Sequence, residues 1–163
     1  MGRILSCVIK FLQDEFDGED LNADEDGMVS FRLDDDRGHE WGCLVFSDED
    51  SEQLMFYSVV LDTASEAQRN EVMKFVTLAN YGLHIGNFEL DLDDGEVRFK
   101  TSMDVEGVEV TEAICRNLME LNFMIMGRYF EGLRAVMAGS AAAADAIADI
   151  EDDDDDDDDD DDE

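Results

Sequence analysis

Hydrophobic residues near the start of the chain recur at steps of three and four, which is the spacing of an α-helix. The pattern consists of Ile4, Leu5, Val8, Phe11 and Leu12. Because residues three and four positions apart share one face of a helix, residues 3–16 are predicted to form an amphipathic helix. The acidic stretch 17–26 then ends it.

Three segments that follow have the composition of β-strands. Residues 29–33 alternate between apolar and polar side chains, the period-two pattern of a strand with one buried face. Residues 41–46 and 54–61 are instead almost continuously apolar. Runs of this kind are typical of central strands, so we expect both faces of these two strands to be covered.

Residues 88–101, FELDLDDGEVRFKT, have the pattern of a β-hairpin. They contain Asp94-Gly95, a dipeptide that favours a two-residue type I′ turn. The cross-strand pairs that this turn predicts are Leu92 with Val97, Leu90 with Phe99, Asp91 with Arg98 and Glu89 with Lys100. Opposite charges then face each other across the strands, so a hairpin accounts for the acidic residues without a metal site.

Helical patterns recur in two further parts of the chain. Val72, Val76, Ala79 and Leu83 mark the buried face of a second helix. A third helical stretch starts at Thr111, a typical N-cap residue, and ends at Gly139. It carries one apolar stripe of Ile114, Leu118, Leu121 and Ile125 and a second stripe of Met119, Phe123, Met126, Phe130, Leu133 and Met137. Two stripes indicate burial on two sides or contact with a partner, and we expect a bend near residues 122–127 that divides the stretch into two helices.

Together these elements predict an α+β fold in the order α-β-β-β-α-β-β-α-α, with an antiparallel five-stranded sheet packed against helices. Residues 1–139 are expected to form one domain. Residues 140–163 are interpreted as an alanine-rich spacer followed by an acidic tail with the poly-Asp run Asp152–Asp162. The tail is predicted to be disordered, because it repels itself and has nothing to bury.

The chain has 163 residues and a formal net charge of −34 at pH 7. Such a charge repels phosphate backbones and anionic lipid, so neither nucleic acid nor a membrane is an expected partner. No apolar run approaches the ~20 residues that a membrane-spanning helix needs, and we expect a cytoplasmic protein. A basic partner and adaptation to a high-salt habitat are both compatible with this acidity, and the composition leaves them open.

The sequence contains little candidate chemistry. It has no recognisable nucleophile motif and no glycine-rich phosphate loop. Residues 22–27 resemble the start of a calcium loop, but Leu33 stands where that loop needs a bidentate glutamate. Cys7, Cys43 and Cys115 are widely spaced in apolar runs and are interpreted as reduced, buried thiols. We therefore expect no enzyme activity, no cofactor and no metal ion.

Four short segments carry a resemblance to a known family. Residues 78–80, 86–91, 94–99 and 129–139 resemble the YbjN family of small bacterial proteins. The resemblance spans residues 3–139 and implies a fold similar to that of type III secretion chaperones, which are usually dimeric and hold an extended segment of a client. Members of the family are described as sensory-transduction regulators, with no catalytic residue set.

The resemblance implies a non-catalytic protein-binding module, regulatory or chaperone-like, in a bacterial cytoplasm. Its expected partner is a protein, and a homodimer is compatible with it. The candidate partner surface is the second stripe, Met119, Phe123, Met126, Phe130, Leu133 and Met137, although methionines at helical spacing would equally fill the core. The alternative is an acidic-tail protein that acts as a weak cation buffer or as an anionic chaperone for a basic partner.

Overall fold

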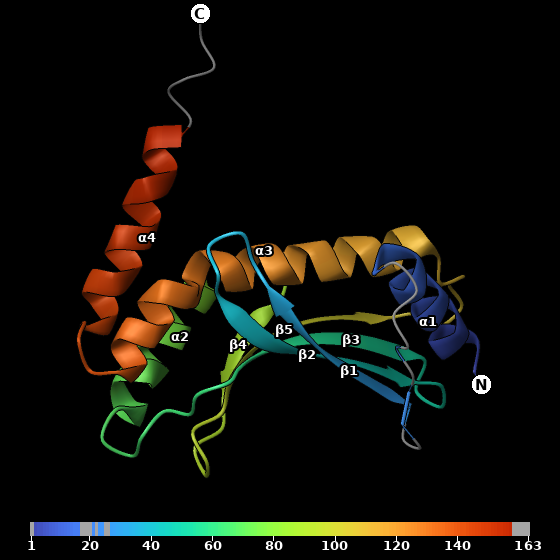
Figure 1. The fold of residues 1–163 in the computed structure, drawn as a ribbon, viewed down its shortest axis with the longest axis horizontal. Helices are drawn as coiled ribbons and strands as arrows, with labels where there is room; N and C mark the ends of the chain where they lie inside the picture. The colour runs from blue at the N-terminus through green and yellow to red at the C-terminus, as the bar shows by residue number, and fades with distance from the viewer. Residues whose placement is uncertain (1, 17–20, 22, 25–26, 158–163) are drawn as a thin grey trace, which may run out of the picture.

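The computed structural model describes residues 2–16, 21, 23–24 and 27–157, with side chains as far as residue 152. These residues form helices and strands in the predicted order α-β-β-β-α-β-β-α-α (Figure 1). The last two helices occupy other residues than predicted, because one helix spans Glu112–Met137 and the final helix spans Ala143–Asp157. The elements are α1 (Arg3–Glu15), β1 (Met28–Asp34), β2 (Glu40–Asp48), β3 (Gln53–Val60), α2 (Arg69–Gly82), β4 (Asn87–Leu90), β5 (Val97–Asp104), α3 (Glu112–Met137) and α4 (Ala143–Asp157).

The strands form one five-stranded antiparallel sheet in the order β1-β2-β3-β5-β4. β1 and β4 are therefore its edge strands. The helix α2 lies between β3 and β4 in the chain, which lets β4 join the sheet outside β5. The α+β fold class predicted from the sequence is confirmed.

All four helices lie on one face of the sheet. α3 runs along that face, with α1 near one end and α2 and α4 near the other (Figure 1). One hydrophobic cluster joins α1 and the start of α3 to core residues such as Val45 and Phe56. A second joins α2, α4 and the rest of α3 to residues such as Trp41 and Phe99. The expectation that helices cover both faces of β2 and β3 is therefore wrong, because no described helix packs on the other face.

The β4–β5 hairpin forms in a register that differs from the prediction by two residues. The observed pairs are Phe88 with Phe99, Glu89 with Arg98 and Leu90 with Val97. The loop has four residues, 92–95, instead of two. It is closed by hydrogen bonds from the Asp91 N–H to the Glu96 C=O and from the Gly95 N–H to the Asp91 C=O, both 2.9 Å. A shift of two residues leaves each strand residue on its predicted face.

Contacts outside the hairpin hold this longer loop. The Ala64 N–H donates to the C=O of Gly95 at 2.8 Å, and Arg69 Nη1 donates to the C=O of Leu92 at 2.9 Å. Gly95 has a φ of +86°, and a Cβ added there would lie 2.1 Å from the C=O oxygen of Ala64. Only glycine fits this position, so the Asp-Gly dipeptide marks the hairpin although it forms a different turn.

The helix α3 is continuous, and the predicted bend near residues 122–127 is absent. The hydroxyl of Thr111 accepts a hydrogen bond from the Ile114 N–H at 3.3 Å, and Gly139, with a φ of +73°, follows the C-cap residue Ala138. Both predicted ends of the helical stretch are therefore correct. The bend is absent because the side chain of Asn122 is buried against the sheet, where its polar atoms have partners.

The last helix comes from residues that the sequence analysis assigned to a spacer. α4 buries Ala143, Ala146 and Ile147 in the cluster that it shares with α2 and α3. Gly132 permits this packing, because a Cβ there would lie 2.9 Å from the Ile150 Cδ1 atom. The domain boundary predicted at residue 139 therefore lies between α3 and a helix that packs against it, and it stays a prediction. Residues 158–163 of the predicted disordered tail lie outside the described residues.

Candidate partner-binding surface

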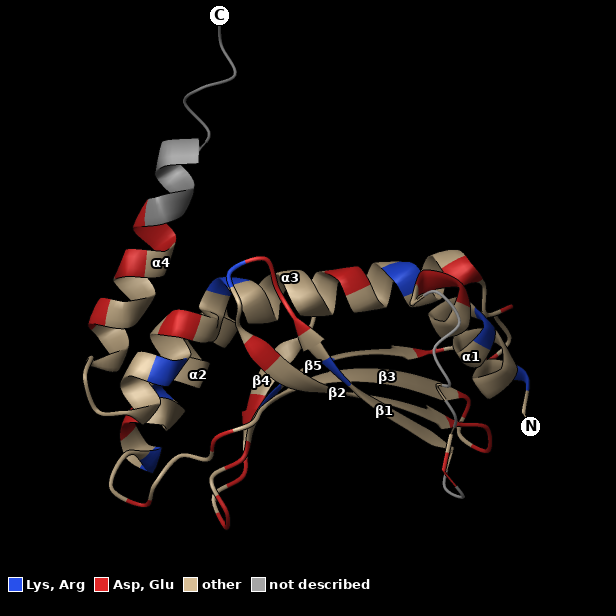
Figure 2. Ribbon diagram, viewed as in Figure 1, with Lys and Arg blue, Asp and Glu red and all other residues tan. Residues whose placement is uncertain are grey.

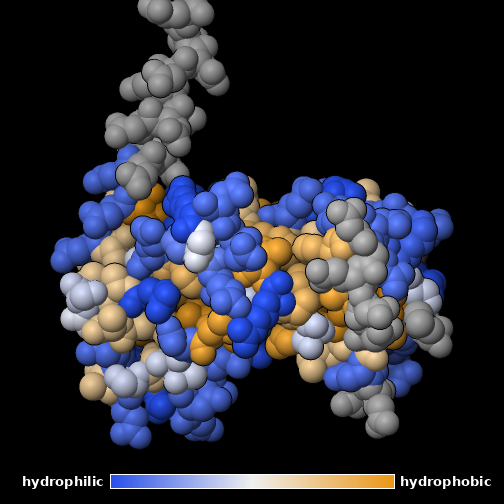
Figure 3. Space-filling view, viewed as in Figure 1, coloured by the Kyte–Doolittle hydropathy of each residue, from blue (hydrophilic) through white to orange (hydrophobic). Residues whose placement is uncertain are grey.

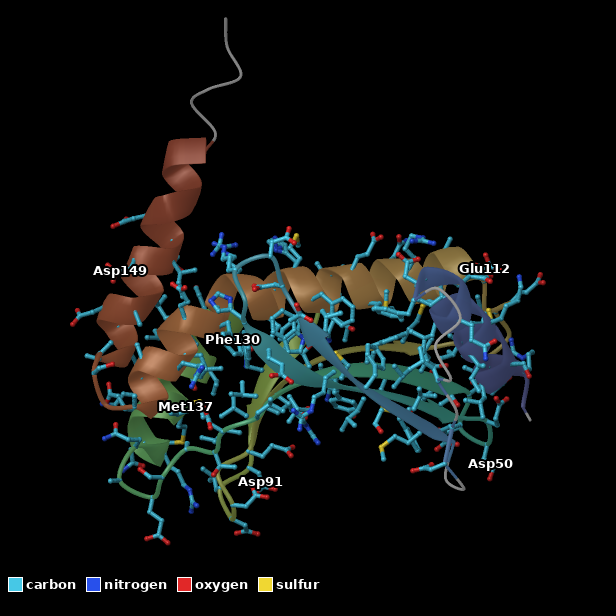
Figure 4. All side chains as sticks on the ribbon, viewed as in Figure 1. Asp50, Asp91, Glu112, Phe130, Met137 and Asp149 are labelled. Carbon is cyan, nitrogen blue, oxygen red and sulfur yellow. The ribbon has the colours of Figure 1, made fainter. Side chains whose placement is uncertain are left out.

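The six residues predicted to form a partner surface are distributed between the core and its rim. Met119, Met126, Phe130 and Leu133 are buried under α3, in contact with the sheet or with other helices. Phe123 and Met137 are half-buried beside them. Figure 4 shows Phe130 and Met137 on the last turns of α3, close to α2 and the sheet. The structure thus gives this stripe the core position that the sequence had left as the alternative.

The sheet face opposite α3 carries the exposed apolar surface that this stripe does not provide. We call this surface the open face. Its apolar residues are Met28, Leu44, Phe46, Met55, Tyr57 and Val59. They stand in rows across the strands, because Phe46 pairs with Met55 and Leu44 pairs with Tyr57. All six are partly exposed, and none belongs to either hydrophobic core cluster.

Basic side chains continue the open face onto β5. Arg98 lies with its guanidinium carbon 4.7 Å from the centre of the Tyr57 ring, a cation–π contact. Its Nε donates to Glu89 at 2.7 Å, and Lys100 bonds to the same carboxylate. Burial acts to raise the pKa of Glu89, but the hydrogen bonds from Lys100 and Arg98 outweigh it and lower that pKa. This end of the face therefore holds a charged network with Glu89 at its centre.

A hollow of about 360 Å³ lies in the open face where Gly42 provides no side chain. Its lining includes Ser30, Leu44, Val59 and Leu61 from the flanking strands and the end of β3. A Cβ on Gly42 would meet Leu61 and Val59 at 3.7 Å, which is ordinary contact. The glycine is therefore not required by the fold, and its absent side chain leaves room for one apolar group from outside.

The two edges of the sheet differ in whether their backbone groups are paired. At β4, the side chain of Asn80 bonds to the outward backbone of Phe88, accepting from its N–H at 2.7 Å and donating to its C=O at 3.0 Å. Asn80 thus occupies the place that an added strand would take.

At β1, only the first residue has such partners. The N–H and C=O of Met28 both bond to Asp24, at 2.9 Å each. Because backbone groups alternate along a strand, those of Ser30 and Arg32 also point away from β2, and no described residue pairs with them. Within the described part of the chain, the β1 edge beside the open face therefore keeps unpaired outward backbone groups at Ser30 and Arg32.

Acidic residues surround the open face more than they occupy it. Figure 2 shows acidic residues mainly on the helices and turns, with the strands mostly tan. Figure 4 places Asp50 in the β2–β3 turn and Asp91 in the β4–β5 loop, at opposite ends of the sheet. Figure 3 shows apolar side chains along the middle of the molecule between hydrophilic ends. The surface is therefore an apolar strip with an acidic rim.

A second exposed apolar surface lies on α2. Its members are Met73, Leu78 and Tyr81, followed by Ile85 beyond the helix end. Tyr81 is 95% exposed. Glu71 is the single acidic residue of α2, and it is half-buried and bonded to Lys74 at 2.9 Å. This helix face is unusual in so acidic a chain, because none of its exposed side chains is a carboxylate.

The family assignment rests on a match that covers most of the chain. Residues 17–135 match the model of the YbjN family, described as "Putative bacterial sensory transduction regulator". This chain belongs to the YbjN family. The resemblance recognised from its short segments is thereby confirmed.

Two solved structures share the YbjN chain's fold at low sequence identity. "Structure of the HopA1-SchA Chaperone-Effector Complex" contains a chain with 14% identity and a TM-score of 0.51, covering 75% of this chain and 89% of that one. "Crystal Structure of the ExsC-ExsE Complex" contains one with 19% identity and a TM-score of 0.50, covering 76% and 93%. No curated protein sequence matches this chain. The expected similarity to the type III secretion chaperone fold is confirmed.

The described part of this YbjN protein contains neither a metal-binding cluster nor a membrane-spanning helix. Among the described residues, no group of three or more His, Cys, Asp or Glu side chains is placed to hold a metal ion. Asn22, Glu25 and Asp26 of the calcium-loop-like stretch lie outside the described residues. None of the helices in the described part of the chain is long and apolar enough to cross a bilayer.

The open face was not predicted, because apolar side chains on both faces of β2 and β3 were taken to mean that both faces are covered. The apolar runs of β2 and β3 indicate that both faces of these strands are apolar, which is correct. They do not indicate what covers the second face. All four helices lie on one face of the sheet, and the apolar side chains on the second face are left without a helix.

Proposed function

We propose that this YbjN protein is a non-catalytic protein-binding module that holds an extended segment of a partner protein. The segment pairs with the β1 edge and places alternate side chains on the open face. The observation that carries this proposal is a combination of two features: outward backbone groups at Ser30 and Arg32 that no described residue pairs with, and the adjacent apolar rows of β2 and β3. Strand addition uses both features at once.

The surface also defines the chemistry of the partner segment. An added strand presents every second side chain to the open face, so apolar residues are required at alternate positions. One of them fits the hollow at Gly42. The net charge of −34 favours a segment that is positively charged overall, because the field of the whole chain attracts it.

We infer a regulatory or chaperone-like role in a bacterial cytoplasm. The family description, which names a sensory transduction regulator, supports the regulatory role. The similarity in fold to a chain from a chaperone–effector complex supports the chaperone-like role. Both roles need a surface that binds a protein segment without changing it covalently.

A second copy of the chain is the partner that we assign to α2. Two copies that meet through Met73, Leu78 and Tyr81 bury apolar side chains on both sides of a two-fold axis. Elsewhere on this acidic protein, self-association brings carboxylates together. The exposed face of α2 has none, so charge repulsion opposes a dimer least at this helix.

The acidic-tail function stays a separate prediction. A weak cation buffer would bind calcium through the poly-Asp run, of which residues 158–162 lie outside the described residues. A calcium titration of the full chain against a chain ending at Asp152 tests this function. Calcium binding that is lost in the shorter chain would support it, and equal binding by both chains would contradict it.

Binding of synthetic peptides tests the proposed function. A ten-residue peptide that alternates valine and lysine provides both apolar side chains and charge, whereas one that alternates serine and lysine provides the charge alone. We expect the valine peptide to bind at least about tenfold more tightly in fluorescence anisotropy, since ~1.4 kcal/mol corresponds to a factor of ten.

Variants of the open face complete the test. Phe46→Ser should weaken binding of the valine peptide about tenfold, because it removes one apolar contact of the strip. Val108→Ser, at an exposed residue between β5 and α3, is the matched control and should leave binding unchanged. Equal affinities for the two peptides would show binding by charge alone and would overturn the proposal. Unchanged binding in Phe46→Ser, or an equal loss in both variants, would show that the open face is not the binding surface and would overturn it as well.

A further inference from the structure

A cavity of about 490 Å³ lies on the helix side of the sheet, between the β1–β2 turn and the middle of α3. Side chains from four elements form its apolar wall, namely Leu33, Trp41, Phe123 and Ile150. Its volume is within the range of about 300–1,000 Å³ that is typical of small-molecule sites. The open face lies on the opposite side of the sheet, so this cavity is separate from the proposed partner surface.

Hydrogen bonds hold the β1–β2 turn in place beside α3. Asp35 Oδ1 accepts from the backbone N–H groups of Arg37 and His39 at 3.0 and 2.9 Å, and Asp35 Oδ2 bonds to His39 Nδ1 at 2.8 Å. The other ring nitrogen of His39 bonds to Glu131 on α3 at 3.0 Å. The two sides of the cavity are therefore joined in advance, which lowers the cost of ordering them around a ligand.

Gly127 lines the cavity from the middle of α3, where a glycine weakens the helix relative to an alanine. A Cβ on Gly127 would lie 3.6 Å from Asp35 Oδ2 and 3.8 Å from Trp41 Cη2, which are ordinary contact distances. The packing therefore does not require a glycine here, in contrast to Gly132. The absent side chain of Gly127 instead leaves space in the cavity.

The cavity also presents both signs of charge. Asp36 and Arg37 line it from adjacent positions of the turn, and no described residue bonds to either of these exposed side chains. Arg128 contributes a second guanidinium from α3. Figure 2 shows acidic and basic residues together on the turn between β1 and β2. A guanidinium binds a carboxylate through paired hydrogen bonds, and a carboxylate accepts from an ammonium group, so the two together match a zwitterion.

We propose that this cavity binds a free α-amino acid with an apolar side chain. The ligand carboxylate pairs with Arg37, its ammonium group pairs with Asp36, and its side chain lies against Trp41 in the space beside Gly127. The net charge of −34 repels an anionic ligand, whereas a zwitterion carries no net charge. The site gives the protein a small-molecule input that does not depend on the proposed partner segment.

Titration of the full-length protein with L-leucine tests the proposal. Trp41 is the single tryptophan of the chain and lies in the cavity wall, so its fluorescence reports binding at this place. We expect a saturable change in this fluorescence and the same affinity in calorimetry. Isocaproate lacks the ammonium group of leucine, isoamylamine lacks the carboxylate and L-serine lacks the apolar body. Each should bind at least about tenfold more weakly, because each loses one of the three contacts.

Two variants assign the binding to this cavity. Gly127→Leu fills the cavity and should abolish binding of leucine, with circular dichroism and thermal melting to verify its fold. Arg37→Gln should weaken binding of leucine at least about tenfold, and it should leave the weaker binding of isoamylamine unchanged because that compound has no carboxylate. Arg3→Gln, in α1 near the other end of the sheet, is the charge-matched control and should leave binding of leucine unchanged (Figure 1).

Four results would each overturn the proposal. They are no binding of leucine, equal affinities for leucine and its analogues, unchanged binding of leucine in Arg37→Gln or in folded Gly127→Leu, and an equal loss in Arg3→Gln. If Gly127→Leu does not fold, Arg37→Gln decides alone, because no described residue bonds to the guanidinium that it removes. The peptide experiments on the open face are unaffected by any of these results.

Discussion

The Ser58 hydroxyl on β3 donates a hydrogen bond of 2.6 Å to the Asn122 Oδ1 atom on α3, and both residues are fully buried. The Asn122 Nδ2 atom donates in turn to the Phe56 C=O at 3.0 Å and to the Thr101 hydroxyl at 3.2 Å. This network ties the middle of α3 to β3 and β5. Every buried side-chain polar group in this network has a hydrogen-bond partner. The network therefore favours one rotation of α3 about its axis relative to the sheet.

Replacing Asn122 should therefore destabilise the fold strongly. Asn122→Leu leaves the buried Ser58 hydroxyl and the Phe56 C=O without this partner, and an unsatisfied buried group costs roughly 1–3 kcal/mol. The Thr101 hydroxyl keeps its bond to the Leu118 C=O at 2.9 Å. We expect the free energy of unfolding in urea to fall by about 2–4 kcal/mol. The double variant Asn122→Leu/Ser58→Ala should recover part of the loss, because it removes one of the unpaired groups. A loss below about 0.5 kcal/mol in the single variant would contradict this role for the network.

The helix α4 should contribute to stability, contrary to the boundary predicted at residue 139. Truncation after Gly139 removes Ile147, whose burial stabilises the fold by roughly 1.5–3 kcal/mol, and uncovers the apolar groups beneath it. We expect this truncated chain to melt well below the full-length protein at low and at high salt. A chain that ends at Asp152 keeps the packed part of α4 and is the matched control. If the chain cut after Gly139 and the full-length protein had equal melting temperatures, the domain boundary predicted at residue 139 would be supported.

Stability should decrease in acid partly through Glu89. Its pKa is lower in the folded chain than in the unfolded one, so its contribution is fully present above the unfolded value of ~4.3. That contribution is lost as the pH falls through the folded pKa. Glu89→Gln should therefore lower the melting temperature near pH 7, and its difference from the wild type should shrink towards pH 3. Glu106→Gln, on an exposed turn, is the control, and a difference that does not depend on pH would contradict the assignment.

Dimerisation through α2 should be sensitive to a single carboxylate. Tyr81→Glu places two like charges opposite each other across the proposed two-fold axis, so we expect a dimeric wild-type protein to become monomeric. Sedimentation velocity at micromolar concentration measures the change, with Val108→Glu as the control. A monomeric wild-type protein, or a dimer that persists in Tyr81→Glu, would exclude this interface.

Much of the fold could be predicted from the sequence because hydrophobic period and local structure agree. The order of elements, the N-cap at Thr111 and the shared face of Leu90 and Phe99 all follow from local pattern. The hairpin register does not follow from local pattern, because it depends on the contact between Gly95 and Ala64, which are distant in sequence. The same holds for α4, whose buried residues pack against α2 and α3, and α2 is distant from α4 in the sequence.

The candidate site could be predicted only in part. The apolar residues of β2 and β3 were visible in the sequence, but the choice between a covered and an uncovered face depends on where four helices pack. The pairing of Asn80 with the β4 edge is likewise a tertiary feature, and so is the β1 edge, where no described residue bonds to the outward groups of Ser30 and Arg32. The methionine stripe of α3 illustrates the reverse case, since its periodicity is that of a core helix and the core is where most of it lies.

Amide hydrogen exchange along β1, with and without the valine–lysine peptide, tests strand addition most directly. In the free protein the outward N–H groups of Ser30 and Arg32 have no described partner, whereas those of Val29, Phe31 and Leu33 point towards β2. We expect the peptide to slow exchange at Ser30 and Arg32 by at least about tenfold, which corresponds to ~1.4 kcal/mol, and to change exchange at the inward amides little. Ser30→Pro removes an outward N–H without breaking the β1–β2 ladder, and it should abolish the effect, unlike Ser30→Ala. Unchanged exchange at Ser30 and Arg32 in the presence of bound peptide, or slowing confined to α2, would contradict the central claim.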